Sequence, residues 1–174
     1  MVAVEIGAAS FGRMRSDLRS EVEQAGFFLA DYEPNRRTFV LGEWLSVATE
    51  GFEIQTGYHI ALTDETQAEI FRCAAATGQT LVEVHSHLGA DQVAFSPSDI
   101  RGFSEWVPQV RWRVGRKPYA AMVWDETSFD ALAWIEPGGE AEQVTELIVT
   151  GPESLAPTAL TLLGLRAEGS DVAL

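Results

Sequence analysis

Short apolar segments recur along the chain and are separated by polar or glycine-containing stretches. Runs rich in valine, isoleucine and aromatic residues, several with alternating polar positions, predict β-strands. The predicted strands cover residues 2–6, 26–31, 38–48, 58–62, 80–85, 119–124, 129–135 and 143–149. Only a short polar segment separates the pair at 119–124 and 129–135, which predicts a hairpin.

Helical signals lie between these strands. An amphipathic pattern predicts a helix over Gly12–Ser20 and another over Asp64–Thr77, which we expect Asp64 to cap and Gly78 to end. A third helix is predicted to begin at Pro97. Strands interspersed with helices predict an α/β fold in which a mixed sheet is flanked by helices.

The length and composition of the chain fit a single domain. Its 174 residues are 46% hydrophobic and include no long linker. We expect the domain to span residues 1–150, with residues 151–174 as a C-terminal tail that is a short helix or a flexible end. The single cysteine excludes an internal disulfide, and the N-terminus lacks the features of a signal peptide. Since no apolar run approaches the length of a membrane span, we expect a cytoplasmic protein with no membrane contact.

The charge balance narrows the class of partner. Twelve Lys and Arg against 26 Asp and Glu give a formal net charge of −14. Binding of a phosphate backbone needs concentrated basic residues, so we expect a protein partner and no nucleic acid. The one basic cluster, at residues 111–117, is interpreted as a solvated loop, with an acidic patch on a substrate protein as the alternative.

Two histidines at the end of an apolar strand carry the main chemical signal. Alternate residues of a strand point to the same face, so His85 and His87 project together while Ser86 points away. The polar, glycine-containing stretch that follows places the pair where the strand enters a loop. Two imidazoles at such a rim can share one metal ion, although an H-x-H pair can also occur without a metal.

A serine and an aspartate follow at a predicted helix start. Ser96 fits the N-cap, Pro97 the first helical position, and Asp99 the acid three residues after the cap. The run could be no more than a capping box. Asp99 in the first helical turn would nevertheless reach an ion held at the strand end. His85, His87 and Asp99 therefore predict three ligands for one Zn²⁺ with an open fourth position, which is typical of catalytic zinc.

The residues H-S-H followed by S-P-S-D resemble the motif of the JAB/MPN zinc metalloproteases, also called JAMM. That family also has an upstream glutamate in a run similar to E-x-x-G-x-L, and here Glu23 precedes Gly26 by three and His85 by 62 residues. The resemblance implies that Glu23 is the general base and that Ser96 stabilises the oxyanion. It also implies a single-domain JAB/MPN, or cytidine-deaminase-like, fold. Leu88 stands where many members have proline, and the loop over residues 88–95 is one residue longer than in several relatives.

The same resemblance implies a substrate. It predicts a zinc-dependent isopeptidase that cleaves after the C-terminus of a ubiquitin-like protein, in precursor maturation or deconjugation. Similarity to the deubiquitinase-like component of bacterial ubiquitin-like conjugation operons implies E1- and E2-like partner enzymes and a role in antiphage defence.

The residues themselves are also compatible with other functions. One is a zinc peptidase or amidase for sulfur-carrier tails or small amino-acid conjugates, and another is a non-catalytic scaffold. The complete set of candidate catalytic and metal-binding residues counts against a scaffold. An acid at Asp91, four residues after the second histidine, also allows a cupin-like metal site, but the predicted helices disfavour a fold built almost wholly from strands.

Overall fold

The computed structural model describes residues 1–89, 92–151 and 153–167. The strands are β1 (Val2–Ile6), β2 (Ala25–Glu33), β3 (Thr38–Ser46), β4 (Phe52–Gln55), β5 (Ile60–Leu62), β6 (Thr80–Ser86), β7 (Tyr119–Trp124), β8 (Phe129–Trp134), β9 (Glu142–Val149) and β10 (Glu153–Leu155). The helices are α1 (Ala8–Asp17), the short 3-10 helix η1 (Thr49–Gly51), α2 (Asp64–Thr77), α3 (Pro97–Arg113) and α4 (Leu160–Ala167).

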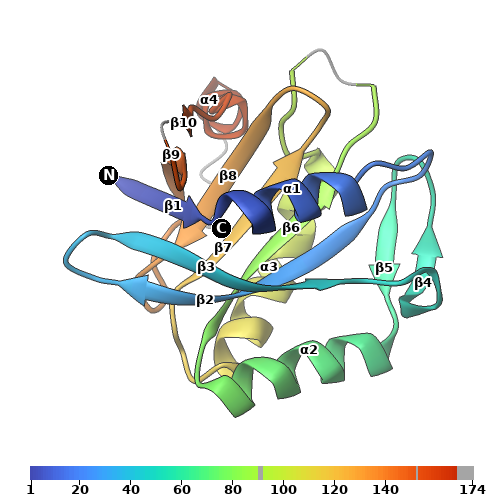
Figure 1. The fold of residues 1–174 in the computed structure, drawn as a ribbon, viewed down its shortest axis with the longest axis horizontal. Coiled ribbons are helices and arrows are strands. Elements are labelled where there is room, and N and C mark those ends of the chain that lie inside the picture. Colours follow the sequence, from blue (N-terminus) through green and yellow to red (C-terminus); the bar gives the residue numbers. More distant parts are fainter. Residues whose placement is uncertain (90–91, 152, 168–174) are drawn as a thin grey trace.

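Seven of these strands close into a mixed β-barrel. Their order is β1-β3-β2-β6-β7-β8-β9, and β9 returns to pair with β1, as Figure 1 shows. Strand β10 adds to β9, while β4 and β5 form a separate two-stranded sheet. The predicted JAB/MPN fold, an open mixed sheet flanked by helices, is therefore wrong. The described residues form a closed barrel with four α-helices instead.

Closure depends on one pairing between the two ends of the sheet. Strand β1 runs parallel to β3 along one edge and parallel to β9 along the other, where Val4 lies opposite Leu147. Because each strand of a closed sheet has two neighbours, no member of the seven-stranded ring presents a free edge. The pattern of residues 2–6 predicts a strand but does not specify both of its neighbours.

Two apolar clusters lie on the two faces of this sheet. The first draws residues from all seven barrel strands and includes Phe11, Met14 and Leu18, which α1 and the residue after it contribute. The second lies on the outer face of β2, β6, β7 and β8, where α2 and α3 cover it with residues such as Ile70 and Phe103. Strands β7 and β8 are buried at every position because both faces are covered. Helix α3 is thus fixed beside β6, the strand that carries the histidines.

The helix ends differ in detail from the sequence expectations. Helix α1 begins at Ala8 instead of Gly12. The cap of α2 is Thr63, whose hydroxyl accepts from the Thr66 amide, so Asp64 lies in the first turn. Gly78 ends α2 as expected, in the left-handed conformation (φ 67°) that glycine adopts without a steric penalty.

The C-terminal segment is attached to the barrel near the start of α3. The buried Asp130 carboxylate accepts from the Thr161 amide and hydroxyl at 2.9 and 2.6 Å. Thr161 Oγ1 accepts from the Phe95 amide, and the Thr158 hydroxyl donates to the Val93 carbonyl. These bonds tie the start of α4 and the residue Thr158 before it to β8 and to the loop that leads into α3. Within the described ranges, no helix is both long and apolar enough to cross a bilayer.

Candidate metal centre

Three side chains from β6 and α3 meet at one point. The Asp99 Oδ2 atom lies 3.3 Å from His87 Nε2 and 3.7 Å from His85 Nε2. Each of the three residues offers a ligand atom within 4.8 Å of the others. The predicted ligand set is therefore brought together, although eleven residues, 88–98, separate His87 from Asp99.

The donor atoms fit a bound cation. His85 is 4% exposed, and its Nε2 atom is buried without a hydrogen-bond partner among the described residues. A buried polar atom without a partner is costly in a folded protein. Two imidazoles and one carboxylate are ligands that zinc commonly takes, and three protein ligands leave a position open. His85, His87 and Asp99 are thus the residues that would hold the ion.

The register of β2 on β6 explains why Glu23 lies beside this point. The two strands are antiparallel, with Ala25 opposite His85, so the same register extended by two residues places Glu23 opposite His87. Glu23 Oε1 lies 3.9 Å from His87 Nε2. Two hydrogen bonds between Gln24 and Ser86 fix the backbone next to Glu23. The Gln24 amide donates to the Ser86 hydroxyl, and the Gln24 carbonyl accepts from the Ser86 amide, both at 2.8 Å.

The absence of a side chain at Gly26 allows this strand to lie where it does. A Cβ atom there would overlap the indole ring of Trp44 and approach the Leu45 carbonyl oxygen to 2.9 Å. The motif position that drew attention to Glu23 therefore has a packing reason of its own.

The start of α3 forms the capping box that the sequence predicts. Ser96 Oγ accepts from the Asp99 amide at 3.2 Å, and Asp99 Oδ2 accepts from the Ser96 amide at 2.7 Å. One carboxylate oxygen thus faces both the helix start and the two histidines. The Ser96 hydroxyl also lies 2.8 Å from the Ser98 hydroxyl, and it is Ser98 that lines the adjacent cavity. The oxyanion role expected of Ser96 remains a prediction.

The electrostatics of the site favour a cation between these groups. Burial alone would lower the pKa of His85, but the nearby carboxylates of Asp99 and Glu83 outweigh it and raise that pKa to about 10. Burial would raise the pKa of Asp99, yet the two histidines hold it far below its usual range. Burial raises the pKa of Glu23, and the nearby His87 partly offsets that rise.

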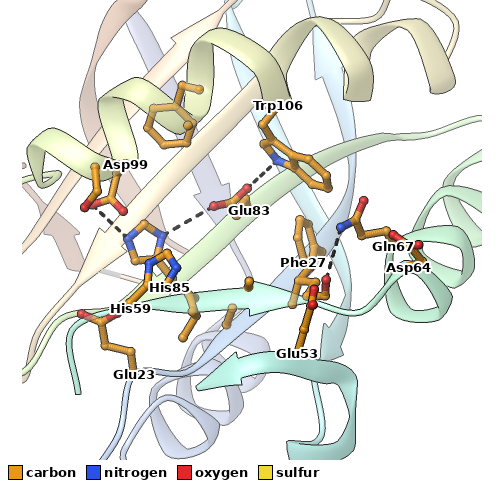
Figure 2. Close-up of a pocket in the computed structure, with 17 residues that line it drawn as sticks. Glu23, Phe27, Glu53, His59, Asp64, Gln67, Glu83, His85, Asp99 and Trp106 are labelled. Carbon is orange, nitrogen blue, oxygen red and sulfur yellow. Dashed lines mark hydrogen bonds and ion pairs between the residues drawn. The ribbon is translucent and has the colours of Figure 1, made fainter. Parts of the chain in front are cut away.

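A cavity of about 380 Å³ is lined by two of the three ligands, His85 and Asp99, and by Glu23. Figure 2 shows Glu23 and Asp99 on opposite sides of His85 and His59, with Phe27 and Trp106 further along the cavity. The segment His59–Leu62 and α3 supply other parts of its lining. The arrangement therefore combines three metal-ligand candidates, a separate carboxylate and room for part of a substrate.

Two residues of this region were not predicted from the sequence. Glu83 lies 3.6 Å from His85 Nδ1 through its Oε1 atom. It shares the strand parity of His85 and His87, so the period-two pattern could have identified it. His59 lines the cavity from a loop before β5, where no pattern in the sequence distinguishes it. The alternative ligand Asp91 lies outside the described residues.

Comparison with known proteins bears on the fold alone. No family model matches the chain, and no curated protein matches it. Among solved structures it is similar to the solution structure of protein DSY2949 from Desulfitobacterium hafniense, with a TM-score of 0.54 and 12% identity, over 86% of this chain and 95% of that one. Such low identity shows a shared fold and nothing of activity.

These findings correct the family assignment made from the motifs. The chain was expected to resemble the JAB/MPN metalloproteases, but its sheet closes into a seven-stranded barrel and the fold it shares is that of DSY2949. The identification with that family is wrong. The spacing of H-x-H and S-x-x-D matched because a strand end followed by a capped helix can bring the same side chains together on another fold.

Proposed function

We propose that this protein is a metal-dependent hydrolase that cleaves an amide bond, with His85, His87 and Asp99 as the ligands of one zinc ion. The observation that carries the proposal is the convergence of three ligand atoms within 4.8 Å of one another, one of them the unpartnered Nε2 of buried His85. Glu23 lies within 3.9 Å of His87, and a cavity of about 380 Å³ adjoins the group.

In the proposed reaction the zinc ion and the side chains of the protein have separate tasks. A zinc ion bound there would supply Lewis acidity, which lowers the pKa of a coordinated water to about 7 and polarises a carbonyl. Glu23 accepts a proton from the attacking water and returns it to the departing nitrogen, so that an amide and water become an acid and an amine. Ser98 lines the cavity and Ser96 lies beside it, which supports a role for their hydroxyls as donors to the developing oxyanion.

A second chemistry suits the same ligands. Two histidines and one carboxylate also form the ligand set of ferrous oxygenases. Glu23 favours hydrolysis, because a buried carboxylate next to the ligands supplies the proton transfer that hydrolysis needs and that oxygen activation does not require. Metal analysis that includes iron as well as zinc separates the two.

The proposal specifies the bond that is cleaved, an amide, and not the molecule that contains it. A ubiquitin-like protein, its conjugates and E1- or E2-like partners follow from the motif resemblance alone, and they stay predictions. Small amino-acid conjugates and sulfur-carrier tails are the other substrates to be tested, and a non-catalytic scaffold is the outcome if no substrate is cleaved.

The test uses the zinc-loaded protein against two sets of probes. One set is a ubiquitin-like protein fused through its C-terminus to a reporter, and the other is a panel of N-acyl amino acids, with release of new amines as the readout. Glu23→Gln is expected to lower turnover by about 10²- to 10⁴-fold, the usual contribution of a general base, while zinc content stays unchanged. Glu21→Gln is the matched control, since Glu21 is exposed and lies two residues away. Equal turnover in both variants would contradict the role of Glu23.

A further inference from the structure

Glu83 is a largely buried carboxylate, and among the described residues it forms no salt bridge with a lysine or an arginine. Its side chain is 15% exposed, and among the described residues its ion-pair contact is with His85 alone. Burying a charge without an opposite charge costs free energy, so the presence of a glutamate at this position of β6 needs an explanation. An apolar side chain would fill the same place on the outer face of β6 at lower cost.

The position of Glu83 is fixed by two donors on different elements. Its Oε2 atom accepts from the Tyr119 hydroxyl at 2.5 Å and from the Trp106 indole nitrogen at 2.8 Å. Tyr119 begins β7 and is fully buried, while Trp106 lies in the middle of α3. Both bonds engage the same oxygen, which leaves Oε1 directed at His85. Figure 2 shows the contacts of Glu83 with Trp106 and with His85.

His85 and His87 differ in the contacts that their ring nitrogens make. In His85 one ring nitrogen, Nδ1, lies 3.6 Å from Glu83, and the other, Nε2, is directed at Asp99. A neutral imidazole carries its proton on one nitrogen only, and an acceptor beside Nδ1 favours the proton there. The lone pair of Nε2 then faces the place where Asp99 and His87 converge. His87 lies next to Glu23 and Asp99 through Nε2 and has no comparable contact at Nδ1 in the described residues.

We propose that Glu83 is a positioning residue that fixes the tautomer and orientation of His85 for metal binding, with Tyr119 and Trp106 holding it in place. The inference rests on the proposed metal centre. Glu83 would then be the outer partner of the ligand His85, of the kind that orients metal-binding histidines and strengthens their donation to the metal. It also explains why a tyrosine, a tryptophan and a glutamate form a buried hydrogen-bonded group beside the ligands.

Zinc affinity provides the first test. Competition with a chromophoric chelator is expected to show a zinc affinity about 10- to 100-fold weaker in Glu83→Ala than in the wild type, which is the usual effect of removing such a partner. Glu83→Gln preserves the shape of the side chain if the alanine variant folds poorly. A glutamine can accept from His85 only by turning its amide group toward the two donors, so its affinity should also fall. Glu105→Gln on the exposed surface of α3 is the matched control and should bind zinc like the wild type.

Nuclear magnetic resonance of the zinc-loaded protein provides a readout that a merely structural role would not change. With ¹⁵N-labelled histidine, the wild type and Glu105→Gln are expected to show a slowly exchanging ring proton on Nδ1 of His85. That signal should be lost or exchange rapidly in both Glu83 variants. Wild-type affinity in a folded Glu83→Ala protein, or a ring proton on Nε2 of His85, would overturn the proposal. Failure of the wild type to bind zinc would instead reject the metal centre itself.

Discussion

Asp99 forms part of the helix cap and is proposed to bind the metal, and two substitutions separate these roles. Ser96→Ala removes the hydroxyl that accepts from the Asp99 amide but leaves the carboxylate in place. Asp99→Asn keeps an oxygen able to accept from the Ser96 amide but removes the charge between the two histidines. The first variant therefore tests the helix cap, and the second tests the metal ligand.

The expected magnitudes follow from ligand linkage. Zinc at about 100 times its Kd stabilises a protein that binds it only when folded by about 2.7 kcal/mol. For a chain of 174 residues each kcal/mol shifts the Tm by about 2–4 °C, so zinc should raise the wild-type Tm by about 5–11 °C. Ser96→Ala should lower the Tm in chelator by about 2–4 °C, for a cap worth about 1 kcal/mol, and keep the full zinc-induced rise.

Asp99→Asn should behave in the opposite way. If the loss of the charged ligand weakens zinc binding by about 100-fold, the same zinc concentration stabilises the variant by only about 0.4 kcal/mol. The zinc-induced rise then falls to about 1–2 °C. Thermal unfolding followed by circular dichroism, with and without chelator, measures all three proteins. A full rise in Asp99→Asn, or the loss of the rise in Ser96→Ala, would refute the assignment of Asp99 as a ligand.

Two further predictions concern the framework of the site. Gly26→Ala should destabilise the protein by about 1–3 kcal/mol in urea unfolding because its Cβ overlaps the Trp44 ring. Gly12→Ala, at an exposed position of helix α1, should instead stabilise it by up to about 1 kcal/mol, and equal effects of the two substitutions would contradict the packing argument. Burial would raise the pKa of Asp125, but hydrogen bonds from the next turn lower it, so this carboxylate stabilises the fold above its unfolded value of 3.8 and that contribution is lost as the pH falls below it. The difference in free energy of unfolding between the wild type and Asp125→Asn should therefore shrink as the pH falls from 6 to about 3, and a constant difference would show that the carboxylate charge is not involved.

Local patterns were sufficient to predict much of this site. His85 and His87 share a face because of strand alternation, and Ser96 and Asp99 form a capping box because the helix begins at Pro97. These relations involve a few neighbouring residues, so the sequence contains them directly. The convergence of Asp99 with the histidines follows from a short loop between a strand end and a helix start.

Relations between distant segments were not accessible in the same way. Glu23 reaches His87 through the antiparallel register of β2 and β6, which a single sequence does not specify, and the motif that located it belongs to another fold. Barrel closure depends on the pairing of β1 with β9 at opposite ends of the chain. Glu83 was predictable in part, since its strand parity matches that of the histidines, but its contacts with Trp106 and Tyr119 are tertiary.

Zinc content after metal stripping, reloading and exhaustive dialysis tests the metal centre most directly. Mass spectrometric metal analysis should find one zinc per chain in the wild type and in Glu23→Gln, and almost none in His87→Ala or Asp99→Asn. A wild-type protein that retains no zinc, or a His87→Ala protein that retains a full equivalent, would contradict the proposal that His85, His87 and Asp99 hold the ion.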